Sequence, residues 1–126
     1  MTIDDPVEVV FLVSALREVL PLTARASPRL AAVVREQVPD WGTTRPCEIS
    51  EVSYAGDEGG IMCRFQAGDA ADAQVFHVSI THMTFDRRSP LAREIARYQK
   101  RRNKRVRRAH ELEMVVGMLG IVEGRP

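Results

Sequence analysis

Residues 48–85 read EISEVSYAGDEGGIMCRFQAGDAADAQVFHVSITHMTF, and this stretch decides the fold. It contains three runs rich in β-branched and aromatic residues, which are typical of strands, at residues 48–55, 61–66 and 74–85. Short segments rich in glycine and aspartate separate the runs and predict turns. Since turns this short join antiparallel neighbours, the stretch predicts a three-stranded antiparallel β-meander.

The alternation of apolar and polar residues predicts the register, because a shift of one residue would turn every side chain to the other face. On the apolar face we expect the pairs Phe65–Phe76, Cys63–Val78, Ile61–Ile80, Val52–Cys63 and Tyr54–Ile61. The opposite face then carries a row of three polar side chains, Glu51, Arg64 and His77, one from each strand.

The segment before the meander predicts a helix over residues 6–20. Asp5 followed by Pro6 is typical of a helix start, and Pro21 ends the run. The helix is apolar on most of its surface, so we expect it to be buried. A strand over residues 7–13 is the alternative, because β-branched residues are dense there.

Two Ser-Pro pairs, at residues 27–28 and 89–90, predict two more helix starts. The helix after the first pair ends at Pro39 and is expected to form a helical hairpin with the N-terminal helix. The second pair begins a C-terminal helix whose apolar stripe is interrupted at Arg102 and resumes at Val106. Both one long helix and a break near Arg102 fit this pattern.

These elements predict a single α+β domain over residues 1–126, with an N-terminal helical hairpin, a meander and a long basic C-terminal helix projecting from about residue 90 onward. A content of 44% hydrophobic and 28% charged residues is typical of a globular protein. No stretch is long and apolar enough to predict a membrane span. The acidic N-terminus does not predict a signal peptide, and Cys47 and Cys63 are expected to be free thiols, so we expect a cytoplasmic protein.

The net charge of +1 conceals a very uneven distribution. Eleven of the 18 Lys and Arg residues lie between Arg87 and Arg108, where Glu94 is the only acid, and the rest of the chain is acidic. Nine of the eleven are arginine, which binds phosphate in a bidentate manner. The residues expected to contact nucleic acid are Arg87, Arg88, Arg93, Arg97, Lys100, Arg101, Lys104, Arg105 and Arg108.

The charge distribution favours a small nucleic-acid-binding protein that contacts phosphates. Phosphates are common to RNA and DNA, so charge does not distinguish the two, and RNA is the expected partner ahead of DNA. The alternative is an interaction module, in which the basic helix docks on an acidic protein or on the acidic body of another copy in a homodimer. The sequence lacks a P-loop, a C-x-x-C motif and a G-x-G-x-x-G motif, so no metal and no cofactor are expected.

The row of Glu51, Arg64 and His77 has two interpretations. As chemistry, Arg64 could hold a phosphate while His77, oriented by the carboxylate of Glu51, acts as a general acid or base. As structure, the same three residues form a row of charges on a solvated sheet face, and this interpretation is favoured.

Parts of the chain resemble the RelE/ParE/HigB superfamily of small bacterial toxins, in which a helical hairpin packs on an antiparallel sheet and a C-terminal helix follows. The segments that carry the resemblance are residues 60–65 (GIMCRF), 78–85 (VSITHMTF) and 87–90 (RRSP), followed by Glu94-Ile95. The resemblance implies metal-independent cleavage of RNA, either free or on the ribosome. It also implies that Arg64 and His77 stabilise the phosphate and move a proton, and that Arg87 and Arg88 contact RNA.

Overall fold

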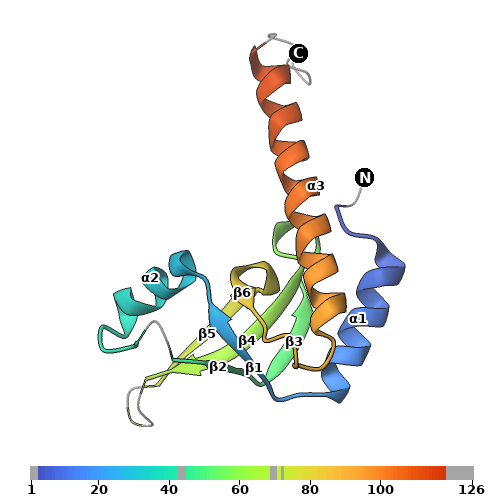
Figure 1. Cartoon of the computed structure of the whole chain (residues 1–126). Helices are drawn as coiled ribbons and strands as arrows, with labels where there is room; N and C mark the ends of the chain where they lie inside the picture. The colour runs from blue at the N-terminus through green and yellow to red at the C-terminus, as the bar shows by residue number, and fades with distance from the viewer. Residues whose placement is uncertain (1–2, 43–44, 69–70, 72, 119–126) are drawn as a thin grey trace.

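The computed structural model describes residues 3–42, 45–68, 71 and 73–118, with the side chains described up to residue 112. The described part of the chain is α+β, with two small antiparallel three-stranded sheets and three helices, of which the last is long and extends beyond the body (Figure 1). The helices are α1 (Pro6–Glu18), α2 (Pro28–Gln37) and α3 (Ala92–Met118). The strands are β1 (Leu22–Ala26), β2 (Cys47–Ile49), β3 (Glu51–Tyr54), β4 (Ile61–Ala67), β5 (Gln74–Ser79) and β6 (Met83–Thr84), with short 3-10 turns η1 (Gly56–Glu58) and η2 (Ile80–His82).

The sheet β3-β4-β5 is the predicted meander, and its register is confirmed on both faces. The pairs are Val52–Cys63, Tyr54–Ile61, Cys63–Val78 and Phe65–Phe76, and Arg64 pairs with both Glu51 and His77. The rings of Phe65 and Phe76 stack with their centroids 5.4 Å apart. This apolar face is therefore closely packed against the core.

The predicted pairing of Ile61 with Ile80 is wrong, because β5 ends one residue earlier. Ser79 is the last paired residue, opposite Met62, and its hydroxyl accepts a hydrogen bond from the Thr81 amide at 3.3 Å. This cap begins η2, which turns Ile80 into the core, where it is 1% exposed. The third predicted strand is therefore divided into β5 and β6.

The second sheet, β2-β1-β6, was not predicted, and it replaces the helical hairpin. β1 lies between α1 and α2 in the chain and pairs with β2 on one side and with β6 on the other. Its side chains alternate, with Leu22 and Ala24 buried and Thr23 exposed. A five-residue strand between two prolines has the sequence appearance of a connector, which is why the hairpin prediction is wrong.

α1 begins as predicted, and a strand over residues 7–13 is ruled out. The Asp5 carboxylate accepts a hydrogen bond from the Val7 amide at 2.9 Å, which caps the helix. The expected burial of the whole helix is wrong, because α1 packs on the body through one face, mainly against β3. Its inner face is buried, whereas Val7, Val10 and Phe11 are 78%, 67% and 68% exposed.

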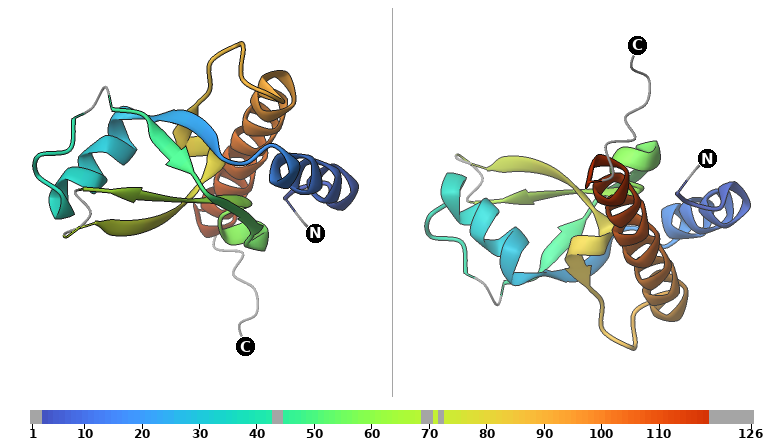
Figure 2. Two further views of the ribbon diagram at one scale, coloured as in Figure 1. Left: turned by 90° about the horizontal axis from the view of Figure 1, so that it is seen from below. Right: turned by 90° about the horizontal axis from the view of Figure 1, so that it is seen from above.

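α3 is continuous, so the alternative of a break near Arg102 is wrong. Ile95 and Tyr98 are buried against the body, and Gln99 anchors the helix by donating to the carbonyls of Ile80 at 2.8 Å and Met83 at 2.7 Å. Figure 2 shows α1 and α2 at opposite ends of the sheets, with α3 next to α1. In the part of the chain that the structure describes, no helix is long and apolar enough to cross a membrane.

Candidate nucleic-acid interface

The outer surface of α3 is strongly basic. Eight cations between residues 93 and 108 are exposed, and the only acid in that range, Glu94, is half-buried. They are Arg93, Arg97, Lys100, Arg101, Lys104, Arg105, Arg107 and Arg108. With 3.6 residues per turn and a rise of 1.5 Å per residue, the set covers most of the outer side of the helix over about 22 Å.

Four of these cations surround one groove on the helix surface. Its lining consists of Arg101, Lys104, Arg105 and Arg108, and its volume is about 250 Å³. Positive charges gathered around one open space raise the local potential and attract an anion. A phosphate placed there would meet guanidinium donors, which suit bidentate contacts, and one ammonium group.

The N-terminal segment of the chain holds α3 in place beside this groove. Arg101 forms an ion pair with Glu8 of α1, and Arg105 donates a hydrogen bond to the Ile3 carbonyl at 3.0 Å. Ile3 in turn donates its amide to the Asp57 carboxylate at 2.9 Å. The inner edge of the basic surface is therefore attached to the body, while its outer part faces solvent.

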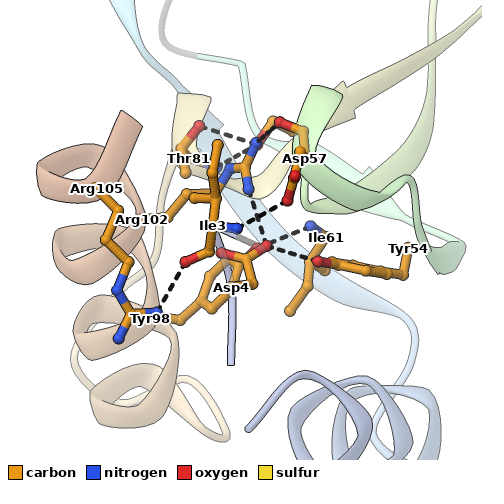
Figure 3. A network of polar contacts seen from close by, with 10 residues as sticks. Ile3, Asp4, Tyr54, Asp57, Ile61, Thr81, Tyr98, Arg102 and Arg105 are labelled. Carbon is orange, nitrogen blue, oxygen red and sulfur yellow. Dashed lines mark hydrogen bonds and ion pairs between the residues drawn. The ribbon is translucent and has the colours of Figure 1, made fainter. Parts of the chain in front are cut away.

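A buried ion pair joins α3 to the N-terminal segment (Figure 3). Arg102, which is 5% exposed, donates to the Asp4 carboxylate at 2.8 Å and to the Asp57 carbonyl at 2.8 Å. The same Asp4 oxygen accepts hydrogen bonds from Tyr98 at 2.9 Å and from Tyr54 at 3.0 Å. This network joins the N-terminal segment, the meander and α3.

Tyr98 has a second role in the network, because its hydroxyl also accepts a hydrogen bond from the Ile61 amide at 3.0 Å. Burial raises the pKa of the Tyr98 hydroxyl, and the neighbouring carboxylate of Asp4 raises it further. Burial and the Asp4 carboxylate also raise the pKa of Tyr54. Both phenols therefore keep their protons at neutral pH and donate them to Asp4.

Arg102 is one of the eleven cations of the basic segment, but its side chain is buried, so it is not among the eight cations of α3 that face solvent. In the sequence, Arg102 interrupts the apolar stripe of the C-terminal helix. It follows Ile95 by seven residues and Tyr98 by four, which places all three on one side of the helix. That spacing is the signal that could have identified Arg102 as an inward-facing residue.

Arg87 and Arg88 are exposed and precede α3, at the end of the helix opposite to Arg108. The amide of Arg88 donates to the Asp86 carboxylate at 2.8 Å, which makes a local turn before the helix. The predicted nucleic-acid residues therefore lie along the whole basic segment rather than at one point.

The predicted row of Glu51, Arg64 and His77 is present on the solvated face of the meander. Arg64 lies 3.5 Å from the Glu51 carboxylate and donates to the Ser50 hydroxyl at 2.9 Å. The row borders an open groove of about 350 Å³, to which Arg17 also contributes. Neighbouring strands are about 4.8 Å apart, and β4 lies between β3, which carries Glu51, and β5, which carries His77. The Glu51 carboxylate therefore lies next to Arg64 and pairs with it, while His77 is two strand spacings away.

No protein-family model, no curated protein and no solved structure matches this chain. Function is therefore inferred from charge and geometry alone.

Proposed function

We propose that this protein binds nucleic acid through α3 and contacts the phosphate backbone. One observation carries the proposal: between residues 93 and 108, α3 presents eight exposed cations and a single half-buried acid, and this helix extends out from the body (Figure 1). Like charges spaced three or four residues apart destabilise a helix slightly, and a bound polyanion would remove that repulsion. Neutralising phosphates releases condensed counterions, which is the main source of non-specific affinity for nucleic acids.

The contacts proposed are to the backbone and not to the bases. Tyr98, the aromatic residue of the basic segment, is 1% exposed and is held by Asp4 and Ile61, so it offers no surface on which a base could stack. Arginine and lysine contacts to phosphate fix position without reading sequence. Backbone contacts suit both polymers, so RNA is tested beside duplex DNA, whose major groove admits a helix.

The experiment measures binding to labelled RNA and to duplex DNA across a salt series. The test variant is Arg97→Gln with Arg108→Gln, two exposed residues outside the described contacts that hold α3 to the body. The control is Arg29→Gln with Arg45→Gln, which removes the same two charges from exposed positions elsewhere. Both variants have the same net charge, so only the position of the lost charge differs.

We expect the affinity to fall steeply with salt for the unaltered protein and for the control. For the test variant we expect weaker binding and a log–log salt slope that is smaller by about 2, because each lost phosphate contact lowers it by about 0.9. Equal effects of the two variants would show that α3 is not the interface. Absence of binding to either polymer in low salt would overturn the proposal.

A second candidate function is metal-independent cleavage of RNA by the meander. The observation that favours it is the adjacency of Arg64 and His77 beside an open groove, an anion-binding group next to a proton-transfer group. Here Arg64→Ala and His77→Ala should each abolish cleavage of a labelled RNA in the presence of a chelator, with the melting temperature nearly unchanged. Cleavage that survives both substitutions would exclude this site.

A further inference from the structure

The first residues that the structure describes run along the inner edge of the basic surface of α3. Residues 3–8 read IDDPVE, with three acids and no base. Glu8 forms an ion pair with Arg101, and the Ile3 carbonyl accepts a hydrogen bond from Arg105 at 3.0 Å (Figure 3). Both arginines line the groove of about 250 Å³ on α3. Two of the four cations that would surround a bound phosphate therefore already have a partner in the chain itself.

The Glu8 carboxylate occupies Arg101 in the manner expected of a phosphate. Carboxylates and phosphates are both anions whose oxygens accept hydrogen bonds from a guanidinium group. The side chains of Arg101 and Glu8 are 48% and 22% exposed, so solvent reaches the pair. An exposed ion pair is weak because water and salt screen it. A phosphate of a polyanion can therefore displace this carboxylate, and the displacement lowers the affinity by a small factor.

A second contact of the same segment keeps Glu8 beside Arg101. Asp4 pairs with Arg102 at 2.8 Å, and these two side chains are only 1% and 6% exposed, so a polyanion in solution does not reach them. Asp4 and Glu8 are four residues apart, and Arg102 directly follows Arg101. The buried pair therefore gives the Glu8 carboxylate a high effective concentration at Arg101, and a displaced carboxylate stays close enough to return.

Asp5 adds negative charge to the next part of the same surface. It lines a cleft of about 550 Å³ between the N-terminal segment and α3, together with Arg105 and Arg108. Its carboxylate is held by the hydrogen bond from the Val7 amide that caps α1. A fixed anion in this cleft lowers the positive potential that attracts a polyanion to α3. The N-terminal segment thus opposes binding both by contact and by charge.

We propose that the Glu8 carboxylate is an internal competitor of the polyanion, so that a phosphate on Arg101 and the Glu8–Arg101 ion pair exclude each other. This competition rests on the proposed function, because it regulates the same surface. The form in which the pair is closed is the form of lower affinity. By linkage, a change that weakens the pair raises the affinity for the polyanion, and a bound polyanion weakens the pair by the same factor.

The test is equilibrium binding of the full chain to labelled RNA and to duplex DNA across a salt series. Glu8→Gln removes the charge of the carboxylate and keeps its shape. We expect about two- to fivefold tighter binding, the range that corresponds to loss of an exposed ion pair. On duplex DNA the log–log salt slope should be steeper by about 0.9, because Arg101 gains one phosphate contact.

The matched control is Glu18→Gln, which removes the same charge from an exposed position near the other end of α1. Glu18 lies about 15 Å along the helix from Glu8, beyond the screening length at physiological salt. The control should therefore change the affinity much less than Glu8→Gln. Melting temperatures of both variants show whether they are folded.

A double-mutant cycle with Arg101→Gln shows whether the effect passes through Arg101. In a chain that carries Arg101→Gln, Glu8→Gln should raise the affinity no more than Glu18→Gln does. The proposal is overturned if the polymer binds but Glu8→Gln and Glu18→Gln have equal effects, if the gain persists without Arg101, or if Glu8→Gln weakens binding. Absence of binding by every variant, in contrast, overturns the proposed function and the competition together.

Discussion

Arg102 and Asp4 lie 98 residues apart in the chain, yet the arginine Nη1 is 2.8 Å from the aspartate Oδ2. The side chains are 6% and 1% exposed, so water contributes little to their solvation. Charges taken out of water are tolerated when they are paired and their remaining hydrogen-bonding groups are satisfied. Tyr98 and Tyr54 donate hydrogen bonds to the Asp4 carboxylate, and the Asp57 carbonyl accepts one from Arg102, so both charged groups have further partners.

Removal of the carboxylate in Asp4→Ala should destabilise the protein by about 3–5 kcal/mol, because it leaves the charge of Arg102 buried without its partner. Urea unfolding monitored by circular dichroism measures this loss. The double variant Asp4→Ala with Arg102→Met should lose less stability than Asp4→Ala alone, since no charge then remains inside. A loss below about 1 kcal/mol for Asp4→Ala would contradict this prediction, because a loss of that size is typical of an exposed ion pair.

The two tyrosines of the network should differ in their contribution to stability. Tyr98→Phe removes the donor to Asp4 and also the acceptor of the buried Ile61 amide, so we expect a loss of about 1–3 kcal/mol. Tyr54→Phe removes one hydrogen bond from a residue that is 41% exposed, so its loss should be about 0.5–1.5 kcal/mol. Thermal unfolding of both variants in the same buffer gives the order, and equal losses would contradict it.

Gly60 and Gly56 form a matched pair for a backbone test. Both have a positive φ, +69° and +70°, which costs an alanine about 1–2 kcal/mol. A Cβ at Gly60 would overlap the Tyr98 hydroxyl and lie 2.7 Å from the Arg102 Nε, whereas a Cβ at Gly56 meets nothing within 4 Å. Gly60→Ala should therefore cost about 2–5 kcal/mol and Gly56→Ala only the conformational part.

The same comparison tests the position of the network. If both alanine variants unfold at the same urea concentration, the close approach of Gly60 to Tyr98 and Arg102 does not affect stability. Combination of Gly60→Ala with Tyr98→Phe, which removes the nearest of the overlapping atoms, should cost less than the sum of the two separate losses.

Cys47 and Cys63 should react slowly with thiol reagents in the folded protein. Both are buried and free, and burial raises the pKa of Cys47 to about 11 and that of Cys63 to about 12. The thiolate is the reactive form, so little of it exists at neutral pH. Labelling with a chromogenic disulfide should be slow in buffer and rapid in urea, and rapid labelling in buffer would contradict the burial.

These thiols also predict a loss of stability in alkaline solution. A thiol of the unfolded chain ionises near its ordinary value of 9.0, below the folded values. The stabilisation is therefore complete below pH 9 and is lost as the pH rises toward the folded pKa values. The melting temperature should fall as the pH rises from about 9 to about 11, and Cys47→Ala with Cys63→Ala should show a smaller fall.

Local patterns were sufficient for much of the fold. Alternation along β3, β4 and β5 predicted the register from Val52–Cys63 to Phe65–Phe76, because a slip would have exposed the whole apolar face. Capping residues located the starts of α1 and α2 at Pro6 and Pro28. These signals depend on neighbours within a few residues, which a sequence displays directly.

Features that depend on distant partners were not predictable in the same way. β1 is short, and it is a strand because it pairs with β2 on one side and β6 on the other. Residues 22–26 alone carry no signal for these pairings. α1 has apolar residues all round, and only the packing decides that Phe11 faces solvent. Arg102 is buried because Asp4 meets it, so its separation from the other basic residues of α3 emerges only in three dimensions.

The sequence separation of Asp4 and Arg102 has a consequence for the order of folding. Ribosomes add about 5–20 residues per second, so Asp4 waits about 5–20 s in water before its partner is made. Contacts between such distant residues form late, after the meander can assemble from its own short turns. An interaction absent from the folding transition state slows unfolding and leaves the folding rate almost unchanged. We therefore expect the pair to lengthen the lifetime of the finished protein against unfolding and to contribute little to how quickly it folds.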